Sequence, residues 1–229
     1  MQYPINVNHS FINIHAHIKN VKAFQNFNFT LYNLDATEFS KYEKDVFYSA
    51  GIHPWYIKED WLLYTTEQIV KLKYKNVLAV GECGLDKNIA INFELQKVVF
   101  QCQIALANKF EKPLIIHCVK AYQEVLFELK NMQNNMPVIF HGFNKNTEIA
   151  KSIIDAGYYI SVGKSIMNSN NKNKDVLKTI PIEKLFLETD DSNFSIENIY
   201  ESASKIVALP TNKLKQQIIT NFKKVFQII

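Results

Sequence analysis

Short apolar runs alternate with longer stretches of helical periodicity along this chain of 229 residues. The short runs are rich in β-branched and aromatic side chains and are bounded by polar residues or glycine, which is typical of buried strands. Eight strands are predicted in this way, at residues 11–15, 30–34, 46–51, 77–82, 114–117, 138–141, 158–162 and 185–189.

Between the strands, apolar residues recur three and four positions apart, as a helix with one buried face requires. One helix is predicted with Leu95, Val98, Val99, Cys102, Ala105 and Leu106 on its buried face. A second is predicted with Ile149, Ala150, Ile153 and Ile154 inward and with Gly157 at its C-terminal end. Thr211 is expected to cap a C-terminal helix that turns Leu214, Ile218, Phe222 and Val225 inward.

Alternating strands and helices predict an α/β protein with parallel strands and right-handed crossovers, and eight strands favour a TIM-type (β/α) barrel. Between His17 and Val46 the chain is too short for two full crossover helices, so the early βα units are expected to be abbreviated. The polar tract at 168–174 is expected to be a mobile loop. Residues 1–229 are expected to form a single domain.

Composition narrows the class of protein. The chain is 47% hydrophobic and 21% charged, without an apolar run of membrane-spanning length or a secretory leader, so we expect a soluble cytoplasmic protein. Its three cysteines form no C-x-x-C pair and are expected to be reduced. The net charge of +4 is too small to indicate a surface that coats nucleic acid. All 26 basic residues are lysine, so any phosphate must be held by lysine, backbone amides or metal ions.

Potential metal ligands stand at the ends of the predicted strands. They are His15, His17, Glu82, His117, His141 and Asp190. Each residue alone is also explained as an ordinary polar residue of the core or of a loop. Together, at the carboxyl ends of parallel strands where such barrels carry their active sites, they predict a binuclear metal site. The glycines beside Glu82 are expected to let the backbone turn sharply and to leave space beside the carboxylate.

The segments around these residues resemble the TatD family of metal-dependent hydrolases, which belongs with the amidohydrolase-like metal barrels. The resemblance rests on residues 11–17, 51–55, 80–86, 115–118, 140–143 and 187–190. It covers nearly the whole chain, as far as Asn221-Phe222, and is closest to a short variant with an abbreviated front end.

The resemblance implies two divalent ions, with zinc, manganese and magnesium as the alternatives. One ion would be held by His15, His17, Glu82 and Asp190, and the other by Glu82, His117 and His141. Glu82 would bridge the two ions, and Asp190 would orient the attacking water and take its proton. His53 would lie near the substrate phosphate, although it is equally explained as a turn histidine packed on Trp55.

Three departures from the family pattern affect the surroundings of the ligands. Asn13 stands where relatives usually have aspartate, and it lacks the charge that would raise the basicity of a ligand. Val119 stands where relatives often have arginine, so phosphate binding would pass to Lys120 or be lost. Asp191-Ser192 replaces the family's proline and adds a negative charge beside Asp190.

The function expected from these residues is that of a metal-dependent hydrolase acting on ester bonds. The leading hypothesis is a deoxyribonuclease or related phosphodiesterase with DNA as its substrate, trimming single strands or 3′ ends, with no membrane association and no obligate protein partner. One alternative is an amidase or esterase that uses the same metals on a small molecule. The other is a metal-binding barrel that has lost catalysis and serves as a binding protein.

Overall fold

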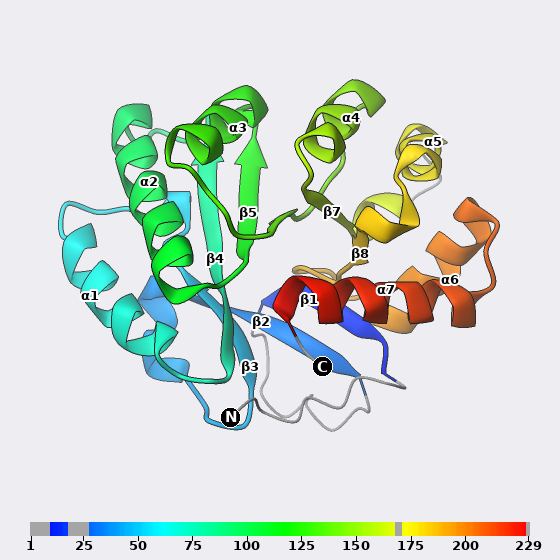
Figure 1. Cartoon of the computed structure of the whole chain (residues 1–229), viewed down its shortest axis with the longest axis horizontal. Coiled ribbons are helices and arrows are strands. Elements are labelled where there is room, and N and C mark those ends of the chain that lie inside the picture. The colour runs from blue at the N-terminus through cyan, green and yellow to red at the C-terminus, as the bar shows by residue number, and fades with distance from the viewer. Residues whose placement is uncertain (1–9, 18–27, 168–170, 228–229) are drawn as a thin grey trace. The chain divides into compact units, whose positions relative to one another are not determined.

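The computed structural model describes residues 10–17, 28–167 and 171–227 (Figure 1). They divide into two compact units. We call Tyr32–Phe140 the central unit, and Met1–Leu31 with His141–Ile229 the terminal unit, because the latter joins segments from both ends of the chain. The single domain expected over residues 1–229 stays a prediction.

The central unit is a parallel sheet. Its strands β3 (Phe47–Gly51), β4 (Val77–Asp86), β5 (Leu114–Val119) and β6 (Val138–Phe140) follow one another in sequence order, after the end of β2 (Phe29–Asp35). Ala50 pairs with Val80, Gly84 with His117, and Leu114 with Val138, all in parallel register. The carboxyl ends of these strands therefore meet at one edge, where β4 and β5 carry Glu82 and His117.

Three α-helices and two short 3-10 helices complete the central unit. They are η2 (Ala36–Lys41), η3 (Pro54–Tyr56), α1 (Trp61–Leu72), α2 (Phe93–Phe110) and α3 (Tyr122–Asn131). Helices α2 and α3 lie beside β4 and β5 in Figure 1. After β2 the chain makes only the 3-10 turn η2 before β3, so the abbreviated connection is confirmed for residues 36–46.

The buried face of α2 differs from the predicted one. Val98 is 48% exposed and Ala105 is also exposed, whereas Gln96 and Gln103 are buried. The two glutamines face inward because they bind buried backbone groups. Gln96 accepts a hydrogen bond from the backbone N–H of Asp86 at 2.9 Å, and Gln103 accepts one from the backbone N–H of Ile52 at 3.3 Å. A purely apolar pattern cannot reveal inward positions that are polar.

The terminal unit contains β1 (Ile12–His17), β7 (Tyr159–Val162) and β8 (Leu185–Leu187). Val162 pairs with Leu187 in parallel register, and the end of β1 forms a parallel bridge between Ala16 and Asp190. Its helices are α4 (Thr147–Asp155), η4 (Lys164–Ile166), α5 (Asn171–Thr179), η5 (Ile182–Lys184), α6 (Ile196–Val207) and α7 (Thr211–Phe226).

Two predictions about these helices are corrected. Of the polar tract expected to be a loop, residues 168–170 lie outside the described residues, but 171–174 form the first turn of α5. This helix forms despite its polar start because Val176 and Leu177 follow and are buried. Thr211 is the first residue of α7, and Pro210 takes the cap position without a side-chain hydrogen bond to the helix. The inward residues predicted for α7 are confirmed, since Leu214, Ile218, Phe222 and Val225 are at most 1% exposed.

All eight predicted strands are confirmed, with ends that differ by a few residues. The largest difference is in β4, which continues to Asp86 instead of ending at Glu82. The cysteines form no disulfide, as expected: Cys83 and Cys118 are buried thiols, and burial raises the pKa of Cys83.

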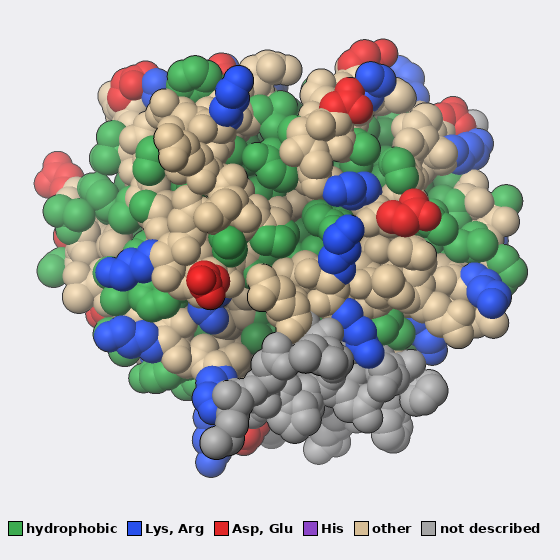
Figure 2. Space-filling model, in the orientation of Figure 1, with side chains coloured by type: hydrophobic (Ala, Val, Ile, Leu, Met, Phe, Trp, Pro, Cys, Tyr) green, Lys and Arg blue, Asp and Glu red, His purple; other side chains and the backbone are tan. Residues whose placement is uncertain are grey.

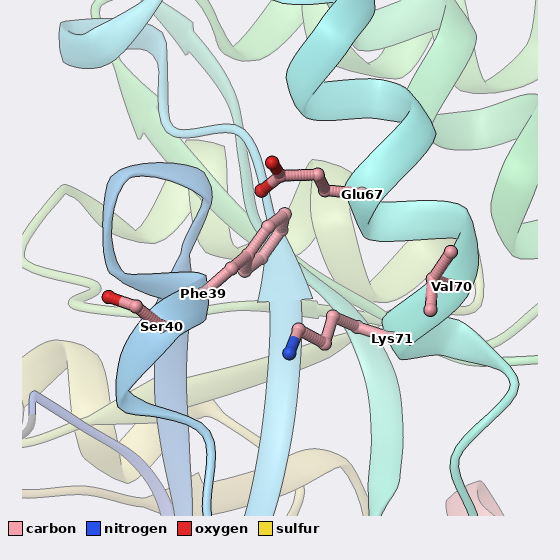
Figure 3. Close-up of a pocket in the computed structure, with 5 residues that line it drawn as sticks. All are labelled: Phe39, Ser40, Glu67, Val70 and Lys71. Atoms are coloured by element: carbon pink, nitrogen blue, oxygen red, sulfur yellow. The ribbon is translucent and has the colours of Figure 1, made fainter.

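The surface carries charges of both signs. Figure 2 shows lysine and acidic side chains dispersed over the face that it displays. Within the described residues, no helix combines the length and the apolar character needed to cross a bilayer. A pocket of about 370 Å³ lies between η2 and α1, where Phe39, Ser40, Glu67, Val70 and Lys71 line it (Figure 3). None of the predicted metal ligands lines this pocket.

Candidate metal centre

In the central unit, two histidines converge on the carboxylate of Glu82. The Nδ1 atom of His117 on β5 lies 2.9 Å from Glu82 Oε1, and the Nε2 atom of His53 lies 3.1 Å from the same oxygen. Glu82 is 2% exposed and His53 is 6% exposed. Potential ligand atoms of the three residues all lie within 4.8 Å of one another. We call His53, Glu82 and His117 the Glu82 group.

His53 is held by the turn that follows β3. Its Nδ1 accepts the backbone N–H of Trp55 at 3.1 Å, and its own N–H donates to Asp35 at 3.1 Å. Burial lowers the pKa of His53 and therefore favours the neutral ring. With Nδ1 occupied as an acceptor, Nε2 carries the proton and donates it to Glu82. The ring also packs edge-on against Trp55, with centroids 5.2 Å apart, so His53 both contacts Trp55 and belongs to the Glu82 group.

Asp86 supports the Glu82 group from the end of β4. Its Oδ2 lies 3.1 Å from His117 Nε2 and accepts the indole N–H of Trp55 at 2.7 Å. Burial by itself would raise the pKa of Asp86, but hydrogen bonds from Trp55, Asn88 and His117 outweigh it and hold the pKa below its usual range. Asp86 was not predicted as a site residue, although its four-residue spacing from Glu82 already put the two on one face of a strand.

The glycines beside Glu82 also permit a close approach of two strands. A Cβ atom at Gly84 would lie 2.0 Å from the carbonyl oxygen of His117, and one at Gly81 would lie 2.7 Å from the Ile115 side chain. They allow β4 to lie against β5 at close range, and the register of β4 shifts between Val80 and Cys83. A side chain at position 84 would displace the backbone of His117, and one at position 81 would displace Ile115.

In the terminal unit, two histidines of β1 face the carboxylate of Asp190. His17 Nε2 lies 3.4 Å from Asp190 Oδ1, and His15 Nε2 lies 3.9 Å from it. Backbone hydrogen bonds fix this arrangement. The N–H of Asp190 donates to the carbonyl of His15 at 3.0 Å, and the N–H of His17 donates to the carbonyl of Asp190 at 3.2 Å. We call His15, His17 and Asp190 the Asp190 group, whose potential ligand atoms also lie within 4.8 Å of one another.

His141 adjoins the Asp190 group and has a carboxylate of its own. Its ring centroid lies 4.2 Å from that of His15, and its Nδ1 lies 3.5 Å from Oε1 of Glu188. Glu188 is 1% exposed and accepts the N–H of Gly142 at 2.6 Å. Among the described residues its second oxygen, Oε2, has no hydrogen-bond partner, which suits a site that holds a cation. The sequence motif contained Glu188, but the pattern alone did not indicate its contact with His141.

Asn13 connects β1 to the segment that carries Asp190. Its Oδ1 accepts the N–H of Thr189 at 2.9 Å, and its Nδ2 donates to the Thr189 hydroxyl at 2.8 Å. Both ends of the amide are therefore occupied by Thr189, and Asn13 acts by fixing the position of the residue before Asp190.

Two lysines lie at strand ends. Lys120 follows β5 and is exposed. Lys164 pairs with Asp191 and lies 3.5 Å from Oδ2 of Asp190. The hydrogen bond to Asp191 raises the pKa of Lys164 and keeps it charged. The acidic residue that replaces the family's proline is thus neutralised in part by Lys164.

Comparison with known proteins identifies the family. A family model described as TatD related DNase matches residues 11–227. The chain belongs to the TatD-related DNase family. The family predicted from the six ligand segments is confirmed.

Two curated relatives of this TatD-family chain illustrate the similarity. A metal-dependent hydrolase of Haemophilus influenzae, described as uncharacterized, is 33% identical over 157 residues, which are 65% of this chain and 60% of the relative. The 3′-5′ ssDNA/RNA exonuclease TatD of Citrobacter koseri is 33% identical over 149 residues, which are 62% of this chain and 56% of that protein. The match spans less than two thirds of the length of either relative.

Solved structures of TatD proteins share the fold. The crystal structure of YjjV, a TatD homologue from Escherichia coli, matches with a TM-score of 0.78 and 20% identity, covering 96% of this chain and 98% of that chain. A TatD-family hydrolase from Entamoeba histolytica matches with a TM-score of 0.78 and 18% identity, over 95% and 98% of the two chains. The predicted fold class, a TIM-type (β/α) barrel, is confirmed.

Proposed function

We propose that this TatD-family chain is a metal-dependent nuclease that hydrolyses phosphodiester bonds of single-stranded nucleic acid, trimming it from the 3′ end. The observation that carries the proposal is that each unit gathers two imidazoles around one carboxylate: His53 and His117 around Glu82, and His15 and His17 around Asp190. The name of the Citrobacter koseri relative supports the choice of substrate.

The donor set fits divalent ions. Imidazole and carboxylate together suit zinc or manganese, whereas magnesium prefers oxygen ligands and keeps bound water. We assign His15, His17, Glu82 and Asp190 to one ion, and Glu82, His117 and His141 to a second, with Glu82 shared. When bound, such ions polarise a phosphoryl oxygen and acidify water.

The chain's own residues position the reactants in this proposal. Asp190 orients the attacking water and accepts its proton, and its backbone bonds to β1 hold the carboxylate in place. His53 and Lys120 bind the substrate phosphates. Lys164, 3.5 Å from Asp190, adds a positive charge in a chain without arginine. A cytoplasmic location and the absence of an obligate protein partner stay predictions.

The test is hydrolysis by protein reconstituted with Mn²⁺, Zn²⁺ or Mg²⁺. Single-stranded DNA and RNA labelled at either end would be assayed beside a panel of small esters and amides. Glu82→Ala and Asp190→Ala are expected to lower cleavage by about 10²-fold or more, since each removes a ligand or the general base. Glu67→Ala, in the pocket between η2 and α1, is the control and should cleave normally.

Three results would contradict the proposal. Cleavage that survives both substitutions would remove Glu82 and Asp190 from the site. Hydrolysis of esters or amides without any nuclease activity would favour the amidase or esterase alternative. Metal binding without hydrolysis of any of these substrates would favour the binding-protein alternative.

A further inference from the structure

Two aromatic side chains of the central unit are exposed directly beside the Glu82 group. Trp55 is 54% exposed and Tyr56 is 44% exposed, although both adjoin His53, which is 6% exposed. The ring centroid of Trp55 lies 6.0 Å from that of His117, and the centroid of Tyr56 lies 5.6 Å from that of His53. Large aromatic rings left in water beside a cluster of potential metal ligands are expected to contact a substrate.

The orientation of Trp55 is fixed from two sides. Its backbone N–H donates to His53 Nδ1, and its indole N–H donates to Asp86 Oδ2 at 2.7 Å. Pro54, which opens η3, restricts the backbone just before it. An indole whose polar atom is satisfied inside the protein exposes mainly its apolar faces, so contact with another flat ring costs little conformational entropy.

We propose that Trp55, together with Tyr56, is a stacking platform for a nucleobase of the substrate strand. The proposal rests on the nuclease function proposed above and specifies how that site recognises its substrate. Base stacking on aromatic rings tolerates any sequence and requires an unpaired, accessible base, which favours single strands over duplexes. It also provides affinity that does not depend on charge, in a chain with a net charge of only +4.

Asp86 connects the platform to the metal ligands. The same oxygen, Oδ2, faces both the indole N–H of Trp55 and the Nε2 atom of His117. A base on Trp55 is therefore held at a fixed offset from His117, which keeps the phosphate of that nucleotide near the Glu82 group.

The first experiment measures binding by fluorescence, without catalysis. The chain has two tryptophans, so Trp61→Phe leaves Trp55 as the only indole reporter. In EDTA, an oligomer of eight thymidylates is expected to quench this fluorescence. An oligomer of equal length and charge, built from abasic tetrahydrofuran units, is expected to leave it unchanged. No quenching by the thymidylates, or equal quenching by both oligomers, would overturn the proposal.

The second experiment uses the metal-reconstituted protein on the same oligomers. Trp55→Ala and Trp55→Phe both lose the indole hydrogen bond to Asp86, so Trp55→Phe is the reference. Relative to it, Trp55→Ala is expected to raise KM for the thymidylate oligomer by about 5- to 150-fold, equivalent to about 1–3 kcal/mol. Its KM for the abasic oligomer should stay the same. Trp55→Phe keeps a ring and should have a smaller effect. Phe127→Ala, at a 63% exposed position of α3, is the matched control and should have none.

The two proposals fail in different ways. If the protein cleaves neither oligomer but the thymidylates still quench Trp55, the nuclease function is wrong and the stacking platform stands. If it cleaves both oligomers with the same KM, before and after Trp55→Ala, the nuclease stands and the platform is wrong.

Discussion

At the scale of single residues, two of the predicted histidine ligands each lie against a carboxylate that was not itself a predicted ligand. Asp86 lies against His117 and Glu188 against His141, each through one ring nitrogen of the histidine. A carboxylate within hydrogen-bonding distance of a ring nitrogen, as Asp86 is of His117 Nε2 at 3.1 Å, fixes which nitrogen carries the proton and raises the basicity of the other, which would then face a metal. Both carboxylates are almost completely buried, which strengthens this effect.

The first prediction concerns Asp86→Asn. The substitution removes the negative charge that orients His117, so affinity for a divalent ion should fall by about 10- to 100-fold. Isothermal titration with Mn²⁺ or Zn²⁺ would measure it, with Asp60→Asn at an exposed position as the control. Unchanged affinity would show that Asp86 does not act on His117.

A second residue-scale prediction concerns Lys112, which has no part in the site. Its ammonium group donates to the carbonyl of Val77, and burial lowers the pKa of Lys112 to about 8. The folded chain therefore binds fewer protons than the unfolded chain between about pH 8 and pH 10.5, and stability from this residue rises with pH across that window. Below it, the charged form costs about 2–3 kcal/mol.

Lys112→Met should consequently raise the free energy of unfolding at pH 7, with a smaller gain at pH 10.5. Urea denaturation at both pH values would measure the two gains. Lys130→Met, at an exposed position of α3, should change the free energy of unfolding by the same amount at both pH values. The same gain at both pH values for Lys112→Met would contradict the assigned cause.

At the scale of elements, β4 shows how a strand can be both a scaffold and a part of the site. Residues 77–80 are apolar and buried in the pattern of a core strand, apart from half-buried Leu78, whereas Glu82 and Asp86 are polar and equally buried. The polar half is stable because its groups find partners: Glu82 N–H donates to Asn33 at 2.8 Å, and Asp86 N–H donates to Gln96.

The third prediction tests the close approach of β4 and β5. Gly84→Ala would put a methyl group 2.0 Å from a backbone oxygen of His117, so it should lower the free energy of unfolding by more than about 4 kcal/mol or prevent folding. Gly157→Ala is the control. Gly157 also has a positive φ, of 88°, but no atom lies within 4 Å of its added Cβ, so it should cost only about 1–2 kcal/mol. Similar losses for the two variants would rule out the strand contact as the cause.

At the scale of the whole molecule, the Asp190 group joins residues from opposite ends of the chain. His15 and His17 come from β1, and Asp190 follows β8, so this group forms only when the two termini of the chain fold together. An ion bound there would stabilise the folded chain, because the unfolded chain offers no preformed site.

The fourth prediction is that metal removal lowers thermal stability. Mn²⁺ at about 100 times its Kd should add about 2.7 kcal/mol per site relative to EDTA. Thermal unfolding with and without metal would measure this shift, and metal analysis would count the ions. His15→Ala and His117→Ala should each retain part of the shift if two ions bind. A midpoint that EDTA does not change would contradict metal binding by the folded chain.

The sequence by itself determined the strands, the fold class and the family. These follow from local signals: apolar runs, helical spacing and the ligand types at strand ends, all of which can be read within a few consecutive residues. The helices α1, α3 and α6 were not predicted, because the notable signals in those stretches were the neighbouring strands and motifs. The start of α5 was mistaken for a loop because its first residues are polar.

Only the tertiary structure decided which groups face one another. The contact of His53 with Glu82, the support of His117 by Asp86 and of His141 by Glu188, and the inward glutamines of α2 all join residues far apart in the sequence. Their partners depend on strand register and on the direction of individual side chains. A shift of a strand by one residue would turn its side chains to the opposite face and break such contacts, while the local sequence pattern stayed the same. The pattern therefore cannot specify which groups meet.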